Sequence, residues 1–207
     1  MIVLGLTGSI GMGKSTASAM LRRLGAPLFD ADAEVHRLLG PGGPAVAKVE
    51  AGFPGVRKPD GGIERPALGR RVFGQPDALK RLEAILHPMV RTAERHFLAR
   101  CRAHREPVAV LDIPLLYETG RGKLCDAVIV VSAPAWLQRQ RVMRRRGMTD
   151  SRFAAILASQ LPDAEKRRRA DFVVVTGLGK RETLRRLQTI LRIARERKIG
   201  RRRRLNA

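Results

Sequence analysis

The sequence predicts an α/β protein, built as a three-layer α/β/α sandwich around a five-stranded parallel sheet. Five short apolar runs alternate with segments that carry apolar residues at helical spacing. This alternation is typical of parallel strands joined by helical crossovers. A glycine-rich loop also separates the first apolar run from the first helical segment, as in the strand–loop–helix units of such folds. At 207 residues, we expect one main domain with small insertions.

The glycine-rich loop follows the apolar run 1–7 and fits the pattern G-x-x-x-x-G-K-[ST] of a phosphate-binding loop. Its glycines allow a tight bend in which backbone N–H groups point at a β-phosphate, and the next helix adds its positive end. We expect Lys14 to reach the β- and γ-phosphates and the Ser15 hydroxyl to hold Mg²⁺. The predicted nucleotide-binding residues are Gly8, Ser9, Ile10, Gly11, Met12, Gly13, Lys14, Ser15 and Thr16.

The second strand is predicted at 28–29, after a helix over 15–24, and it is followed by Asp30 and Asp32. Ligands of parallel α/β sheets bind at the carboxyl ends of the strands. One of these aspartates could therefore accept the proton of an attacking hydroxyl. The alternative is a helix N-cap, because the segment 33–39 has a helical pattern and Asp is a good cap.

The segment 33–105 is predicted to be a helical insertion between the second and third strands. Glycine and proline mark turns over 40–62, with a short helix near 44–51, and further helices are expected at 63–73 and 76–103. The last of these contains Pro88, which could bend it. From the residues alone, His87 beside Pro88 is interpreted as a packing or capping histidine.

The third strand, 107–113, carries Asp112 near its end, which is typical of the second metal-holding acid of phosphate-loop enzymes. A fourth strand is expected at 126–131. Helices over 134–146 and 151–160 then form an arginine-rich hairpin, interpreted as a lid that could stabilise charge on a transferring phosphoryl group. Since one or two arginines at most can face that group, we expect the others to form a solvated basic face.

The remaining segments complete the sheet. A fifth strand is predicted at 170–175, a loop at 176–179 and a helix at 181–197. The basic tail 199–207 is interpreted as disordered, with non-specific affinity for anions.

Composition limits the partners. The formal net charge of +22 indicates a polyanionic partner, either a phosphate-rich small molecule or nucleic acid. Aromatic residues make up 4% of the chain, which is little material for base-stacking surfaces. The only two cysteines, Cys101 and Cys125, offer no metal-binding spacing and suit a reducing cytoplasm. The N-terminal apolar run is too short for a signal peptide, and no apolar segment is long enough to span a membrane.

Several separate stretches of this sequence resemble the dephospho-coenzyme A kinase family, over about residues 2–175. They are the segment 6–16, Asp30-Ala31-Asp32, Arg65 with 68–69 and 72–73, Leu86-His87-Pro88, the segment 112–118, Ala158-Ser159-Gln160 and Ala170-Asp171. One departure concerns the adenine loop, where family members often have an Asp-Asn pair. Here Val175-Thr176-Gly177 stand in that place.

The resemblance implies a kinase that transfers the γ-phosphoryl group of ATP to the ribose 3′-hydroxyl of dephospho-coenzyme A, with Mg²⁺, in the last step of coenzyme A synthesis. It implies that Asp32 is the general base, that Arg141 and Arg145 are lid arginines with Arg145 the stronger catalytic candidate, and that Arg65 and His87 contact the acceptor. Ser15 and Asp112 would hold the metal.

On this interpretation one kinase domain has its core at 1–32, 106–140 and 170–198, an acceptor-binding insertion at 33–105 and a lid at 141–169. Two alternatives stay open: a kinase with another acceptor, such as a nucleoside, a nucleotide or a shikimate-like alcohol, and a nucleic-acid-binding ATPase that uses the basic charge. The scarcity of aromatic residues argues against the second alternative, and no specific nucleic-acid partner is expected. The sequence does not indicate the oligomeric state.

Overall fold

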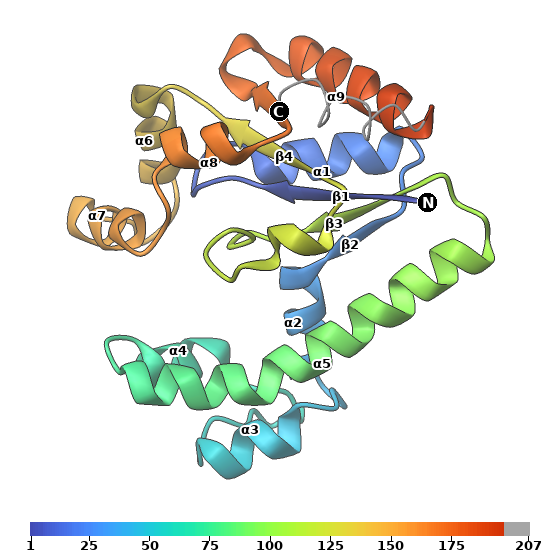
Figure 1. Ribbon diagram of the computed structural model, residues 1–207. Helices are drawn as coiled ribbons and strands as arrows, with labels where there is room; N and C mark the ends of the chain where they lie inside the picture. Colours follow the sequence, from blue (N-terminus) through green and yellow to red (C-terminus); the bar gives the residue numbers. More distant parts are fainter. Residues whose placement is uncertain (197–207) are drawn as a thin grey trace. The chain divides into compact units, whose positions relative to one another are not determined.

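The structure contains one five-stranded sheet among its described residues (Figure 1). The computed structural model describes residues 1–196, so the predicted basic tail and the end of the last predicted helix lie outside the described residues. The strand order is β2-β3-β1-β4-β5. The strands are β1 (Ile2–Thr7), β2 (Leu28–Asp30), β3 (Val108–Asp112), β4 (Ala127–Ser132) and β5 (Phe172–Val175).

The sheet is parallel, and β1 lies at its centre. Parallel pairing matches Leu6 of β1 with Asp112 of β3, and Leu4 of β1 with Ala127 of β4. Every residue of β3 and β4 is buried, which explains why both strands are continuous apolar runs rather than alternating ones. The all-parallel sheet with helices on both sides confirms the predicted fold class.

Most helices lie where the sequence predicts them. They are α1 (Lys14–Arg23), α2 (Ala31–Leu39), α3 (Val46–Gly52), α4 (Arg65–Val72), α5 (Pro76–Ala103), α6 (Ala135–Met143), α7 (Asp150–Ala158), α8 (Asp163–Arg169) and α9 (Lys180–Arg195), with 3₁₀ turns η1 (Arg121–Leu124) and η2 (Thr176–Leu178). Within these residues, no helix combines the length and hydrophobicity needed to cross a membrane.

One helical prediction was wrong at its end, and one helix was missed. The helix predicted to reach 146 ends at Met143, and the next residues turn toward Gly147, which has a φ of 72°. Helix α8 was not predicted at all. Its buried residue is Lys166, so a lysine stands where an amphipathic helix would carry an apolar residue, and the hydrophobic pattern that reveals helices is missing.

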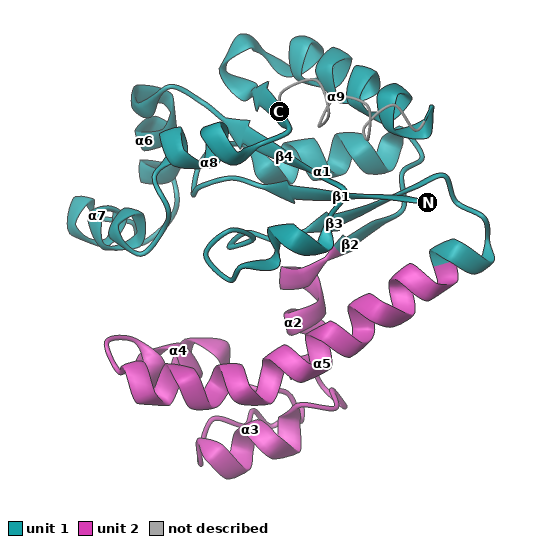
Figure 2. Ribbon diagram, viewed as in Figure 1, with its two compact units in different colours: residues 1–29, 101–207 teal, residues 30–100 magenta. Residues whose placement is uncertain are grey.

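The chain divides into two compact units (Figure 2). The first contains residues 1–29 and the chain from Cys101 onward, and the second contains 30–100. The second unit has buried apolar residues of its own, including Val49 and Phe53, and the Arg81 guanidinium lies 5.6 Å from the centre of the Phe53 ring. An acceptor-binding role for the predicted insertion 33–105 stays a prediction.

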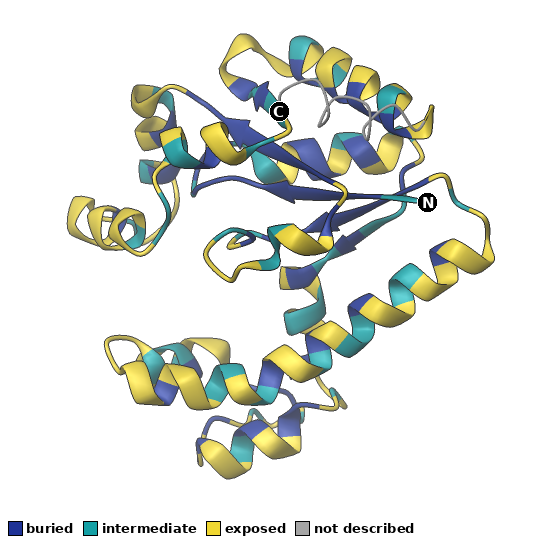
Figure 3. Cartoon of the chain, viewed as in Figure 1, coloured by how far each residue is buried: buried dark blue, intermediate teal, exposed yellow. Residues whose placement is uncertain are grey.

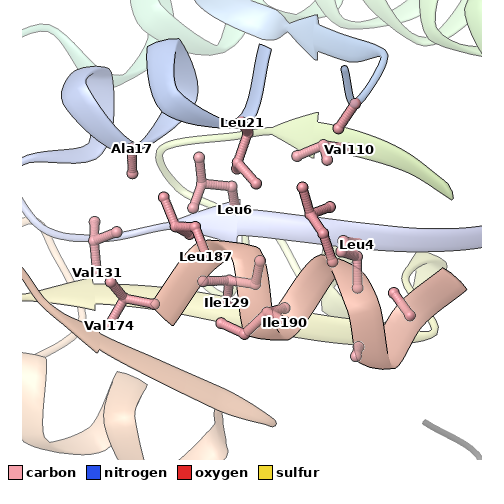
Figure 4. Packing of buried hydrophobic residues seen from close by; sticks show 14 of the residues in the cluster. Leu4, Leu6, Ala17, Leu21, Val110, Ile129, Val131, Val174, Leu187 and Ile190 are labelled. Atoms are coloured by element: carbon pink, nitrogen blue, oxygen red, sulfur yellow. The ribbon is translucent and has the colours of Figure 1, made fainter. Parts of the chain in front are cut away.

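In the first unit, one face of the sheet is covered by α1 and α9, and the three central strands are almost wholly buried (Figures 3 and 4). Leu4 and Leu6 of β1 point into this layer, where they join Leu21 of α1 and Leu187 of α9. Gly5 points to the opposite face, where an added Cβ would lie 2.8 Å from Cys125 Sγ and Leu116 Cδ2. The end of β1, where the glycine-rich loop begins, is therefore held between two packed layers.

We expect Leu187→Ala to lower the free energy of unfolding by about 2–5 kcal/mol, because the side chain is fully buried and its removal leaves a cavity. Leu124→Ala is the matched control, since Leu124 is 58% exposed and should change stability little. Urea denaturation measures both. Equal losses in the two variants would contradict the assigned core.

Candidate active site

The glycine-rich loop connects β1 to α1 and packs closely against α6. Gly11 and Gly13 have φ angles of 77° and 94°, in the left-handed region that favours glycine. A Cβ on Gly11 would lie 2.6 Å from Val142 Cγ2 and 2.9 Å from the Gln138 carbonyl oxygen. The loop needs glycine at position 11 both for its backbone conformation and for the approach of α6.

A buried ion pair joins the loop to the sheet. Lys14 Nζ lies 2.6 Å from Asp112 Oδ1, and Asp112 is only 1% exposed. The other carboxylate oxygen, Oδ2, accepts a hydrogen bond from the Ser18 hydroxyl. Asp112 reaches this position because the register of β1 and β3 places it beside Leu6, at the carboxyl edge of the sheet. The structure thus brings the two predicted charged residues together, with a serine that sequence reasoning missed.

The predicted metal ligands have the right chemistry for Mg²⁺, which prefers hard oxygen donors. Ser15 offers an exposed hydroxyl in the first turn of α1, and Asp112 offers a carboxylate at the adjacent strand end. Throughout residues 1–196, no three His, Cys, Asp or Glu side chains gather as a metal site would require.

Two glutamines bind the backbone of the same loop residue, Ile10. Ile10 N donates to Gln160 Oε1 at 3.1 Å, and Gln138 Nε2 donates to the Ile10 carbonyl oxygen at 2.8 Å. Gln138 belongs to α6, and Gln160 follows α7. Sequence reasoning assigned no role to either residue, because a glutamine in a helical segment gives no signal of its partner.

Arg141 lies against the loop as well. Its Nη1 donates to Thr176 Oγ1 at 2.9 Å and to the Gly11 carbonyl oxygen at 3.4 Å, and its Nη2 donates to the Thr176 carbonyl oxygen at 3.1 Å. Arg145, the other predicted lid arginine, is exposed just beyond α6. Arg139 pairs on the surface with Asp150, at 2.6 Å.

A second charge pair joins α8 to the segment after β3. Lys166 is fully buried, and its Nζ lies 2.8 Å from Glu118 Oε1, which also accepts a hydrogen bond from Leu161 N. Burial acts to raise the pKa of the Glu118 carboxyl, but the Lys166 ammonium and the backbone N–H donors outweigh burial and lower that pKa below its ordinary value. The Lys166–Glu118 ion pair connects α8 to the segment after β3, and the Leu161 hydrogen bond connects the residues just before α8 to the same glutamate.

The remaining predicted residues belong to the second unit. Asp30 is the N-cap of α2, with Oδ1 accepting from Ala33 N at 3.0 Å, and Asp32 is exposed in the first turn of that helix. The capping role therefore falls to Asp30. Arg65 Nη1 lies 3.2 Å from His36 Nδ1, and His87 is exposed on α5.

The fold and the site together define a phosphate-loop kinase. They combine a parallel sheet and a phosphate loop with a lysine paired to the acid on the adjacent strand and with an arginine against the loop. The sequence profile of the dephospho-CoA kinase family matches residues 2–179. This chain belongs to the dephospho-CoA kinase family.

Individual relatives agree with this assignment. A dephospho-CoA kinase of Rhodospirillum rubrum is 58% identical over 194 residues, which cover 94% of this chain and 92% of the relative. A solved structure from Thermus thermophilus is 37% identical with a TM-score of 0.79, covering 92% of this chain and 96% of its own. A dephospho-CoA kinase structure from Campylobacter jejuni is 25% identical with a TM-score of 0.64, covering 93% and 96%.

We expect Gly11→Ala to weaken ATP binding by tenfold or more, because a methyl group there meets α6 and disfavours the left-handed backbone. Gly25→Ala is the matched control. Gly25 has a similar φ of 74°, yet an added Cβ has no atom within 4 Å. Gly25→Ala should lose stability by about 1–2 kcal/mol and keep its affinity. Calorimetric titration with Mg-ATP measures affinity, and equal affinities in the two variants would contradict the close approach.

We expect Glu118→Gln to destabilise the protein by about 1–3 kcal/mol at neutral pH, because it leaves the Lys166 ammonium buried without its counter-charge. The folded-state pKa of Glu118 is lowered, so its contribution is present above the unfolded carboxyl value of about 4.3 and is lost as the pH falls through the folded value. Urea denaturation at several pH values should show the difference from wild type shrinking in acid.

The matched control for Glu118→Gln is Glu182→Gln, which removes the partner of surface arginines on α9 and leaves no buried charge behind, so it should change stability little. A loss in Glu118→Gln that does not change with pH would show that the carboxylate charge is not the cause.

Proposed function

We propose that this protein transfers the γ-phosphoryl group of Mg-ATP to the ribose 3′-hydroxyl of dephospho-coenzyme A, the last step of coenzyme A synthesis. The observation that carries the proposal is the Lys14–Asp112 pair at the phosphate loop, in a chain whose family profile covers residues 2–179. The positively charged surface suits this reaction, because both substrates are polyanions.

Catalysis would depend mainly on positioning and electrostatics, because phosphoryl transfer requires little covalent chemistry from the protein. The loop N–H groups and the start of α1 would bind the β-phosphate, and Lys14 would place its charge on the β- and γ-oxygens. Lys14 can do so because its ammonium is already held at the carboxyl edge of the sheet by Asp112. Arg145, exposed beyond α6, would add positive charge to the transferring group from the lid.

The Ser15 hydroxyl would hold Mg²⁺ together with phosphate oxygens. Asp112 would contribute through water or after rearrangement, since Lys14 and Ser18 engage both of its oxygens. When bound, the cation would neutralise charge on the β- and γ-phosphates.

Asp32 is the proposed general base, which would accept the proton of the attacking ribose hydroxyl. Its exposed carboxylate is available for this role, because Asp30 and not Asp32 caps α2. Arg65 and His87 are the proposed acceptor contacts in the second unit. The cytoplasm is the proposed location, and it suits the two buried cysteines, Cys101 and Cys125, which are not joined in a disulfide.

Direct product detection tests the proposal. The purified protein is mixed with Mg-ATP and dephospho-coenzyme A, and coenzyme A is sought by mass, with adenosine, shikimate and RNA as parallel acceptors. Coenzyme A formed with the first acceptor alone supports the proposal. Consumption of ATP with another acceptor, without coenzyme A, would refute the proposed acceptor.

We expect Asp32→Asn to retain ATP affinity and to lose at least about a hundredfold in turnover, the usual contribution of a positioned base. Asp30→Asn is the matched control, because asparagine caps helices as well as aspartate does, and it should keep most activity. Steady-state kinetics and calorimetry measure the two quantities. Near-normal turnover in Asp32→Asn would exclude Asp32 as the base.

A further inference from the structure

Thr176 connects the turn after β5 to two other parts of the nucleotide site, the phosphate loop and α6. It follows β5 directly and is 8% exposed. Its hydroxyl donates to the Met12 carbonyl oxygen of the phosphate loop at 2.7 Å and accepts from Arg141 Nη1 at 2.9 Å. A single hydroxyl thus serves as donor to the loop and acceptor from α6.

The fit around this hydroxyl is close. A Cβ on Gly13 would lie 2.9 Å from Thr176 Oγ1 and 3.2 Å from its Cβ and Cγ2. A Cβ on the next residue, Gly177, would lie 2.9 Å from Pro134 Cδ at the start of α6. The turn after β5 is therefore seated against both the loop and α6, with little room for another arrangement of Thr176.

The carbonyl oxygen of Thr176 completes the arrangement. Arg141 Nη2 donates to it at 3.1 Å, while Nη1 donates to the hydroxyl. The planar guanidinium therefore donates to two oxygens of one residue. Such paired bonds fix the orientation of an arginine more strongly than one bond does. Without the hydroxyl, the buried Met12 carbonyl and one Arg141 N–H would both lose a partner.

We propose that Thr176 is a positioning residue for nucleotide binding, which fixes the Arg141 guanidinium beside the phosphate loop through its hydroxyl. The inference rests on the proposed function in taking ATP as the nucleotide. It goes beyond that function because it assigns nucleotide affinity in part to a residue that acts through Arg141, at the position where this sequence departs from the Asp-Asn pattern. The aspect it controls is the affinity for nucleotide, rather than the chemical step.

The test compares Thr176→Val with Thr176→Ser. Valine has the shape of threonine without the hydroxyl, whereas serine keeps the hydroxyl. We expect Thr176→Val to raise the dissociation constant and the KM for Mg-ATP about tenfold, the effect of one lost hydrogen bond to a charged group, with kcat changed less than threefold. Thr176→Ser should remain within about threefold of wild type in both constants.

The matched control is Thr183→Val. Thr183 is 2% exposed, and its hydroxyl donates at the start of α9, to the carbonyl oxygen of the N-cap Gly179, so a buried hydroxyl is again lost but away from Arg141. Thermal unfolding of both valine variants measures the structural cost. An equal rise of the KM for Mg-ATP in Thr176→Val and Thr183→Val would mean that general destabilisation is the cause, and it would overturn the inference. Unchanged ATP affinity in Thr176→Val would overturn it as well.

A double-mutant cycle with Arg141→Lys tests whether Thr176 acts through Arg141. Lysine cannot donate to both acceptors from a planar group, so adding Thr176→Val to Arg141→Lys should weaken ATP binding less than twofold further. A full tenfold further loss would show that Thr176 acts independently of Arg141 and would overturn the inference. Because calorimetric binding of ATP needs no acceptor, the result is independent of whether coenzyme A is the product.

Discussion

The buried ion pair between Lys14 and Asp112 is the interaction on which the rest of the site depends. An isolated charge at a position as buried as Asp112 would be costly, so the lysine and the Ser18 hydroxyl are needed to satisfy the carboxylate. The pair also fixes the start of α1 against the end of β3. Loop, helix and strand end are thereby held together at the edge of the sheet where phosphate would bind.

The phosphate loop is further held by side chains from later in the chain. Gln138 and Gln160 bind the backbone C=O and N–H of Ile10, and the Thr176 hydroxyl donates to the carbonyl oxygen of Met12. A loop rich in glycine loses much conformational entropy on folding, and these bonds offset part of that cost. They also tie α6, the segment after α7 and the turn after β5 to the phosphate loop.

The local features of the fold were predictable. Buried parallel strands read as continuous apolar runs, and the phosphate loop has a fixed spacing, so the five strands, the sandwich and the first helix followed from the sequence. The family resemblance also came from short local motifs, and the family profile over residues 2–179 confirms it. Helix α8 was missed because Lys166 occupies its buried position, and no periodicity rule includes a buried lysine paired with a distant Glu118.

The sequence by itself determined the fold class, the phosphate loop and the acid at the end of β3, because these depend on residues close together in the chain. Only the tertiary structure decided which partners meet. It showed that Arg141 contacts the loop while Arg145 is exposed, that Asp30 caps α2, and that Thr176 lies between Met12 and Arg141. The contacts of Arg141 with Gly11 and of Thr176 with Met12 join residues more than a hundred positions apart. The other outcomes depend on which of several similar side chains faces inward, and the packing of strands and helices decides this.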